Sequence, residues 1–205
     1  MSQHGLLIVI SGPSGVGKGT VCQALLRKKA DLVFSVSKTT RQPRPGEKDG
    51  VNYFFVTPEE FQKSIAEGDF LEYACVYDHY YGTPRRAVER MLAAGRDVIL
   101  EIDTQGALQV MQTYPQGVFI FLLPPSGAEL RSRIIKRGTE TEETLKKRLA
   151  AAKSEIELAY KYQYVIVNDH VETACERICA IIEAEKMRVL RNKALINALV
   201  EEVKA

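Results

Sequence analysis

Glycines surround one lysine in the segment Gly12-Pro-Ser-Gly-Val-Gly-Lys18-Gly-Thr20, which directly follows the apolar run Leu6–Ile10. The glycines let the backbone bend so that successive N–H groups point at one anion, and a helix that begins near Lys18 adds its positive end. Lys18 supplies a mobile positive charge for the outer phosphates of a nucleotide. We therefore predict that residues 12–20, called here the phosphate loop, bind a nucleoside triphosphate.

One position of this loop departs from the usual pattern. A Ser or Thr normally follows the lysine and ligates magnesium through its hydroxyl, whereas here Gly19 follows Lys18 and Thr20 comes next. We therefore name no direct metal ligand in the sequence. The four cysteines form no C-x-x-C pair and the three histidines are scattered, so neither a zinc site nor a disulfide framework is expected.

A second group of phosphate-binding side chains lies in a proline-stiffened stretch. Arg41 and Arg44 are three positions apart there, and guanidinium groups hold phosphate in a bidentate way that lysine cannot. The hydroxyls of Tyr53 and Tyr81 could complete the cage. A solvated loop with two packing tyrosines is the alternative reading of the same residues.

Further arginines gather between Arg131 and Arg148, around the segment Gly138–Glu143. Glycine interrupts a helical pattern there and a threonine with acidic residues restarts it, as expected of a hinged basic flap. A solvated helix pair held by Arg–Glu ion pairs is the alternative, but the presence of the phosphate loop favours the flap.

The elements that position these residues alternate along the chain. Apolar runs typical of buried strands are followed by segments of helical period that begin at Lys18, Thr104, Ser126 and Val171. The runs are Leu6–Ile10, Val98–Ile102, Val118–Leu123 and Tyr164–Val167. This alternation predicts an α/β fold with a parallel sheet and helices on both faces, whose ligands bind at the carboxyl ends of the strands.

Two segments stand outside this alternation. Residues from about 35 to 83 are rich in Tyr, Phe and Arg, and we predict a small insert with strands at 51–56 and 70–76 and a helix that opens after Thr57. The region from Val171 to Val203 is predicted to be a long amphipathic helix whose last third packs on the core or on a neighbouring subunit. Its residues available for burial are Ile178, Ile181, Ile182, Leu190, Leu195 and Leu199.

Size and composition limit the classes of protein. The chain of 205 residues fits one domain, with 45% hydrophobic residues and a net charge of +2. That charge is too small to indicate wholesale binding to nucleic acid or to a membrane surface. No stretch approaches the roughly 20 apolar residues of a membrane helix, and we expect a cytoplasmic protein.

Six motifs in this order resemble the guanylate kinases, which belong to the nucleoside monophosphate kinase group, and the chain is similar to a bacterial member. They are Gly12-Pro-Ser-Gly-Val-Gly-Lys18, Ser37-Lys-Thr-Thr-Arg41-Gln-Pro-Arg44, Tyr80-Tyr-Gly-Thr83, Glu101-Ile-Asp-Thr-Gln-Gly106, Arg137-Gly-Thr-Glu-Thr141 and Val165-Ile-Val-Asn-Asp169. The resemblance implies the reaction ATP + GMP = ADP + GDP with Mg²⁺. It also implies a P-loop kinase fold in one domain over residues 1–205: a parallel-sheet core (1–34, 84–125 and 160–205), a mixed GMP-binding insert (about 35–83) and an arginine-bearing lid (about 126–159).

The same resemblance assigns roles to individual residues. ATP binding is implied for Gly12, Pro13, Ser14, Gly15, Val16, Gly17, Lys18, Gly19, Thr20, Arg137 and Asn168. The GMP phosphate is assigned to Arg41, Arg44, Tyr53 and Tyr81, and the guanine to Ser37, Glu72, Thr83 and Asp103. The catalytic residues are Lys18, Arg133, Arg137 and Arg148, while Asp103 is placed to organise the waters of Mg²⁺.

The choice of base has a physical reason. Guanine presents N1–H and N2–H donors on one edge, so the carboxylate of Glu72 can accept both, whereas adenine places an unprotonated N1 there. Two alternatives stay open: a kinase of another monophosphate such as dTMP or AMP, and a catalytically inactive module of the same fold that binds a phosphorylated peptide. The intact phosphate loop argues against the second.

Overall fold

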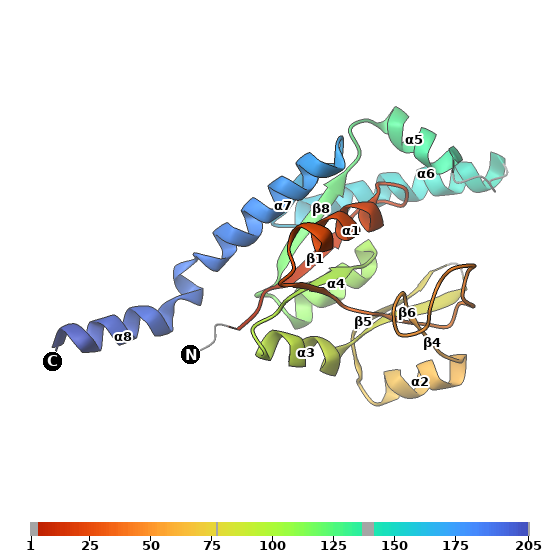
Figure 1. Ribbon diagram of the computed structural model, residues 1–205. Coiled ribbons are helices and arrows are strands. Elements are labelled where there is room, and N and C mark those ends of the chain that lie inside the picture. Colours follow the sequence, from red (N-terminus) through yellow and green to blue (C-terminus); the bar gives the residue numbers. More distant parts are fainter. Residues whose placement is uncertain (1–3, 77, 137–141, 205) are drawn as a thin grey trace.

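Five parallel strands form the central sheet, in the order β2-β7-β1-β8-β9. The strands are β1 (Leu7–Ser11), β2 (Leu32–Phe34), β7 (Asp97–Glu101), β8 (Val118–Leu123) and β9 (Tyr164–Val167). The structure, a computed structural model (Figure 1), describes residues 4–76, 78–136 and 142–204, and for residues 136 and 142–148 it describes the backbone alone. Four of these strands match the apolar runs of the sequence to within one residue at either end, whereas β2 was not predicted because it has only three residues.

Helices cover both faces of this sheet. Along β1, Ile8 and Ile10 pack with α1 (Lys18–Lys28) and α7 (Val171–Lys186), whereas Leu7 and Val9 pack on the opposite face. There they meet α3 (Arg85–Ala93) and α4 (Thr104–Thr113). Because successive side chains of a strand point to opposite faces, one apolar run contributes to two separate cores. The predicted α/β fold is confirmed.

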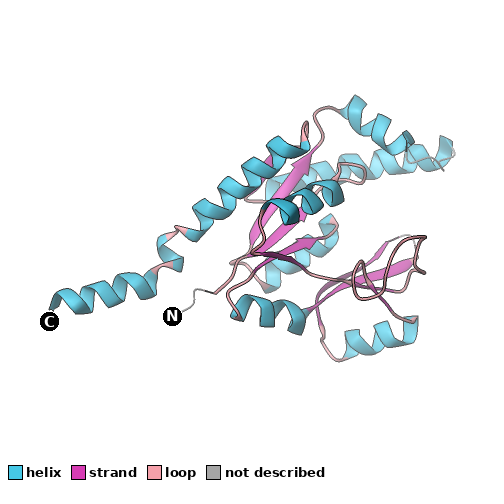
Figure 2. Ribbon diagram, in the orientation of Figure 1, coloured by secondary structure: helices cyan, strands magenta, loops and turns pink. Residues whose placement is uncertain are grey.

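A smaller mixed sheet follows the second strand of the chain. Its strands are β3 (Lys38–Thr39), β4 (Phe54–Phe55), β5 (Phe70–Val76) and β6 (His79–Pro84), in the order β4-β3-β6-β5. Figure 2 shows this sheet in magenta, apart from the central sheet. The helix α2 (Pro58–Ala66) begins at a capping box, in which Thr57 accepts a hydrogen bond from Glu60 N and Glu60 accepts one from Thr57 N. The ring of Phe61 from α2 stacks between those of Phe70 and Tyr80, which attaches the helix to the sheet.

The strand predicted at residues 51–56 is reduced to Phe54–Phe55. The preceding residues bond among themselves, since Val51 N and Asn52 N both donate to Lys48 O and Gly50 N donates to Tyr53 O. This turn uses the backbone groups that a longer strand would have needed for pairing.

Two helices lie across from the small sheet, on the same side of the central sheet (Figure 1). They are α5 (Gly127–Lys136) and α6 (Glu142–Glu157), followed by the 3₁₀ turn η1 (Leu158–Lys161). Leu130 and Ile134 of α5 pack on Ala152 of α6. Ser126, predicted as the first helical residue, instead accepts a hydrogen bond from Glu129 N and so caps α5.

The predicted single C-terminal helix is wrong. It divides into α7, the 3₁₀ turn η2 (Val189–Arg191) and α8 (Lys193–Lys204), which points away from the rest of the molecule (Figure 1). Asn192 Nδ2 donates to Lys186 O and Arg188 O, and these bonds satisfy carbonyls at the end of α7. As a result Leu190, Leu195 and Leu199, expected to be buried, are 66%, 60% and 52% exposed.

Candidate active site

The phosphate loop connects the carboxyl end of β1 to the first turn of α1. Gly17 lies immediately before α1 with φ +96°, in the left-handed region that favours glycine. A Cβ at Gly12 would lie 2.5 Å from Leu122 O, so this position requires glycine because β8 passes so close. The loop conformation therefore depends on glycine at both of its ends.

Two side chains from later parts of the chain brace the loop at Val16. Asn168, at the end of β9, donates from Nδ2 to Val16 O at 2.8 Å, and Arg133 of α5 donates from Nη1 to the same oxygen at 3.2 Å. Arg133 also pairs with Glu129 at 2.9 Å. Of the other predicted lid arginines, Arg137 lies outside the described residues, and only the backbone of Arg148, in α6, is described.

Lys18 lies between two adjoining cavities. Its Nζ donates to Gly12 O at 2.7 Å, which keeps the charge over the loop. A cavity of about 430 Å³ is bounded by the loop glycines, Lys18, Glu101, Asp103 and Glu155, and we call it the loop cavity. A second cavity of about 580 Å³, called here the base cavity, shares Lys18, Glu101 and Asp103 with it.

Residues predicted for one ligand come together in the base cavity although they are distant in sequence. Lining it are Ser37, Tyr53, Glu72, Tyr81 and Asp103. The rings of Tyr53 and Tyr81 meet edge to face with their centroids 5.9 Å apart. Asp103 also accepts a hydrogen bond from Gly106 N at 2.8 Å and thereby caps α4.

Glu72 is the buried acid of the base cavity. It is 4% exposed, and Thr83 Oγ1 donates a hydrogen bond of 2.5 Å to its Oε1. Burial raises the pKa of Glu72 to about 7, and the neighbouring Asp103 carboxylate adds to that rise, whereas the hydrogen bond from Thr83 opposes it. The site therefore contains a carboxyl group that titrates near neutral pH.

Neither of the two predicted phosphate-binding arginines, Arg41 and Arg44, is among the residues that line this cavity. Arg41 pairs with Glu47 at 2.9 Å, and its guanidinium lies 5.4 Å from the centre of the Tyr53 ring. The hydrogen bond from Arg41 to Glu47 holds the pKa of Arg41 above its ordinary value. Arg44 is exposed and is not among the residues that line the base cavity.

Three residues near these cavities had no role in the sequence prediction. Glu101, at the end of β7, has its carboxylate oxygens 3.4 and 3.5 Å from where a Cβ of Gly19 would lie. A Cβ at Gly106 would lie 2.3 Å from Glu72 Oε2. Glu155 contacts the phosphate loop from α6. Glu101 and Gly106 had a signal in the sequence, because both belong to the motif Glu101-Ile-Asp-Thr-Gln-Gly106 and Glu101 lies within the predicted strand Val98–Ile102. Glu155 had none.

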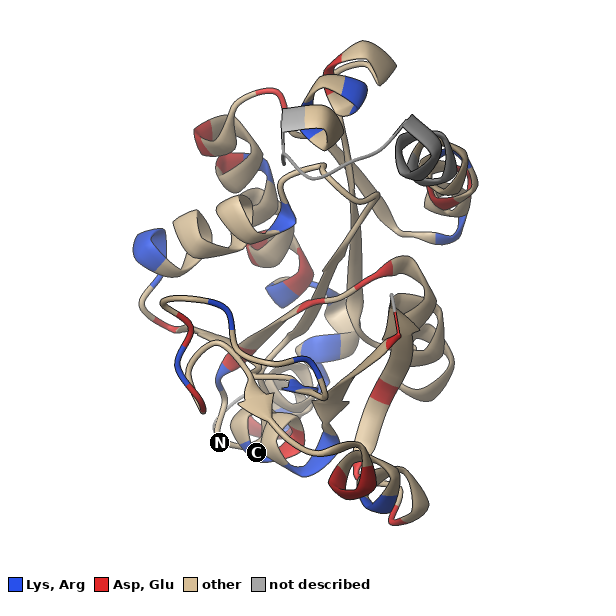
Figure 3. Ribbon diagram, turned by 90° about the vertical axis from the view of Figure 1, so that its right-hand side faces the viewer, with Lys and Arg blue, Asp and Glu red and all other residues tan. Residues whose placement is uncertain are grey.

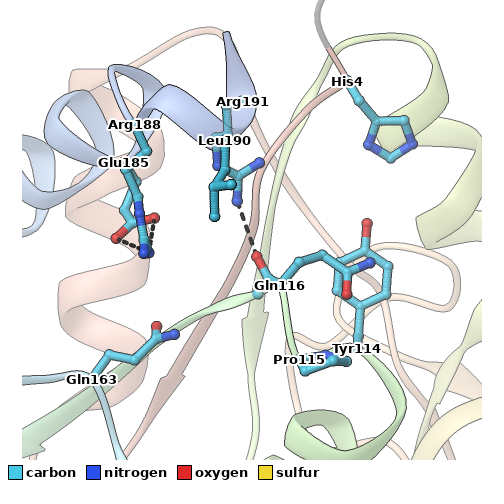
Figure 4. Close-up of a pocket in the computed structure, with 10 residues that line it drawn as sticks. His4, Tyr114, Pro115, Gln116, Gln163, Glu185, Arg188, Leu190 and Arg191 are labelled. Atoms are coloured by element: carbon cyan, nitrogen blue, oxygen red, sulfur yellow. Dashed lines mark hydrogen bonds and ion pairs between the residues drawn. The ribbon is translucent and has the colours of Figure 1, made fainter. Parts of the chain in front are cut away.

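A larger cavity, of about 800 Å³, lies at the opposite end of the sheet, where β8 and β9 begin (Figure 4). Its two arginines already have partners, since Arg188 pairs with Glu185 and Arg191 donates to Gln116 O. Size alone therefore does not identify the functional site. The chemistry is concentrated at the smaller cavities beside the phosphate loop.

Positive and negative charges are mixed along the described part of the chain (Figure 3). Lys and Arg are interspersed with Asp and Glu along the elements (Figure 3). Among residues 4–76, 78–136 and 142–204, no helix has the length and apolar character needed to cross a membrane.

Comparison with known proteins agrees with this geometry. The family model described as guanylate kinase matches residues 4–185. A guanylate kinase of Caldanaerobacter subterraneus is 59% identical over 98% of both chains, and one of Clostridium perfringens is 60% identical over 94% of this chain and 89% of its own. The crystal structure of guanylate kinase from Anaplasma phagocytophilum superimposes with a TM-score of 0.77 at 38% identity, covering 93% of this chain and 90% of that one.

These matches confirm the resemblance drawn from the motifs and, with it, the enzyme class, a nucleotide-binding transferase with guanylate kinase activity. They cover nearly the whole length of the chain and of its relatives. The chain therefore belongs to the guanylate kinase family.

Proposed function

We propose that ATP binds in the loop cavity and GMP in the base cavity, and that the terminal phosphoryl group passes between them beside Lys18. The observation that carries this assignment is the shared wall of the two cavities, which contains Lys18, Glu101 and Asp103. Transfer between two nucleotides requires the attacking and leaving oxygens to be held in line at one place. Adjoining cavities with a common lysine provide such a place.

In this proposal guanine is selected by four residues: Glu72, Ser37, Thr83 and Asp103. The carboxylate of Glu72 accepts hydrogen bonds from guanine N1–H and N2–H, and adenine offers no such pair of donors. Thr83 orients Glu72 through their hydrogen bond and is itself fully buried. A site built on buried polar contacts can discriminate by about 10⁴-fold.

The GMP phosphate is assigned to Arg41, Arg44, Tyr53 and Tyr81. The position of Arg41 over the ring of Tyr53 supports this, because it places a phosphate-binding guanidinium beside a tyrosine that lines the base cavity. Arg41 exchanges Glu47 for the phosphate when GMP binds, so one anion replaces another at the same guanidinium.

Charge stabilisation drives the transfer without a dedicated base. A phosphate oxygen of GMP is already anionic near neutral pH, so the protein has only to align it and neutralise the moving group. We assign this task to Lys18, the amides of the phosphate loop, and the arginines Arg133, Arg137 and Arg148. Arg137 and Asn168 are also assigned to the ATP side, where Asn168 braces the loop.

The residues present fit a Mg²⁺ ion that accompanies ATP. Hard cations prefer oxygen ligands, and the carboxylates of Glu101 and Asp103 both line the loop cavity. Gly19 brings no hydroxyl, but the Glu101 carboxylate lies against it. We propose that Glu101 and Asp103 hold the ion through its waters. When bound, the ion neutralises charge on the ATP phosphates.

We also propose that two copies of the chain associate through α8. Leu195, Ile196, Leu199 and Val200 are all at least 41% exposed along this helix. In an antiparallel pair of these helices, the helix dipoles oppose each other favourably. We further propose that the core, insert and lid have the boundaries given above. We also propose a cytoplasmic location, where ATP and GMP are available.

Release of ADP from ATP and Mg²⁺ tests the reaction, measured with GMP, AMP, dTMP, UMP or no acceptor over a range of concentrations. GMP-dependent release with matching GDP formation and little activity elsewhere is the expected result. A folded protein that releases no ADP in response to any acceptor would instead support the phosphopeptide-binding alternative.

A further inference from the structure

A carboxylate from α6 reaches the phosphate loop. Glu155 Oε2 accepts a hydrogen bond of 3.1 Å from Ser14 N–H, although 141 positions separate the two residues in the sequence. Glu155 is half-buried and forms part of the wall of the loop cavity. This bond connects α6 directly to the loop.

The surroundings of Glu155 are those that a phosphate would find. Burial holds the pKa of Glu155 above its ordinary value and the Asp103 carboxylate adds to that rise, whereas the Ser14 N–H and the charge of Lys18 oppose it and favour the anion. The amides of such a loop point toward an anion, and a carboxylate oxygen is an anionic acceptor of similar size to a phosphate oxygen. Glu155 therefore stands where the loop holds negative charge.

We propose that Glu155 is an internal competitor of ATP: in the nucleotide-free protein its carboxylate takes the place of a phosphate oxygen on Ser14, and ATP binds once that carboxylate has left. This inference rests on the ATP site proposed above. Two anions in contact repel each other, and one N–H cannot serve both fully, so the phosphate and Glu155 exclude each other.

Displacement of Glu155 also acts on α6. The helix bears Glu155 near its C-terminal end and Arg148 two turns earlier. The Ser14–Glu155 bond holds this helix against the phosphate loop, and ATP breaks it on binding. Occupation of the ATP site and the position of α6 are thereby linked, and the apparent affinity for ATP is reduced by the fraction of molecules in which Glu155 remains bound.

Calorimetric titration without GMP tests this competition, with ADP and inorganic tripolyphosphate as the probes. Glu155→Ala removes the carboxylate and should lower the Kd of both probes by about tenfold. Glu155→Asp keeps the charge but is one methylene too short to reach Ser14, so it should lower the Kd as well. In steady-state assays the KM for ATP should fall in both variants while the KM for GMP stays unchanged.

Glu157→Ala is the matched control, because Glu157 is exposed on the same helix and its removal changes the net charge equally. Its Kd values should equal those of the unmodified protein, and thermal unfolding checks that every variant is folded. An unchanged or higher Kd in Glu155→Ala overturns the proposal. A lower Kd in Glu155→Ala without a lower Kd in Glu155→Asp overturns it as well. The Kd for ADP is also measured in Lys18→Ala. If this variant binds ADP as tightly as the unmodified protein does, the ATP site itself is misplaced.

Discussion

The hydroxyl of Thr83 donates a hydrogen bond of 2.5 Å to Glu72, and both side chains are buried at the edge of the base cavity. Burial alone favours the protonated carboxyl, since a charged group loses its hydration there. The hydrogen bond opposes that effect only in part, and the pKa of Glu72 remains at about 7. If Glu72 accepts the guanine donors as proposed, recognition of guanine is linked to pH near neutrality.

The first prediction concerns this pH dependence. A carboxyl group with a raised pKa is protonated below that value and then cannot accept both guanine donors. The kcat/KM for GMP, which reports the free enzyme, should therefore fall by up to about tenfold for each pH unit below 7. The phosphate of GMP titrates near pH 6, so the same profile is measured with Glu72→Gln as the control. Coincident profiles for the two proteins would contradict the prediction.

Glu72→Gln also tests the choice of base. The variant replaces one acceptor oxygen with an NH₂ group, which meets the donors of guanine unfavourably. Its kcat/KM for GMP should fall relative to that for AMP by at least about tenfold. An unchanged ratio of the two values would remove Glu72 from the base site.

Gly106 positions Glu72 by leaving space for it. A methyl group at this position would lie 2.3 Å from Glu72 Oε2, so Gly106→Ala must displace the carboxylate. We expect an increase of about tenfold or more in the KM for GMP, with little change in the KM for ATP. Gly127→Ala is the control, since no atom lies within 4 Å of that added methyl group in α5. Equal kinetics in the two variants would argue against a role for Gly106.

Lys18 should matter for turnover far more than for folding. Its ammonium group lies over the loop and between the two cavities, the place at which the proposed transfer would develop charge on the moving phosphoryl group. Lys18→Ala should lower kcat by about 10²–10³-fold while the midpoint of thermal unfolding changes little. Lys28→Ala, at the other end of α1, is the control. Near-normal turnover in folded Lys18→Ala would refute the catalytic assignment.

The association through α8 has a direct test. Leu199→Glu places a charge on the exposed apolar face. Because Leu199 is 52% exposed in the single chain, the substitution should not disturb the fold of the monomer. Sedimentation at micromolar concentration should show a larger species for the unmodified protein and a monomer for the variant. A monomeric mass for the unmodified protein would remove this proposal.

The phosphate loop and the helix caps could be predicted from the sequence because their hydrogen bonds join near neighbours. Gly17 precedes α1 directly, and Thr57 and Glu60 cap α2 within one turn. The same holds for the central strands, whose apolar runs require burial on both faces. The C-terminal helix failed this reasoning, because Asn192 and the contact of Arg191 with Gln116 end α7 where the apolar pattern continues.

The sequence by itself determined the family, the central sheet and the glycine-rich loop at residues 12–20, since these depend on local backbone chemistry and on motifs read in order. Only the tertiary structure decided how deeply Glu72 is buried, that Gly106 makes room for it, and that Glu155 meets Ser14 from the far end of α6. Desolvation and contacts between residues many positions apart arise from packing. The spacing of residues along the chain does not encode this desolvation or these contacts, which affect the charge of Glu72 and of Glu155.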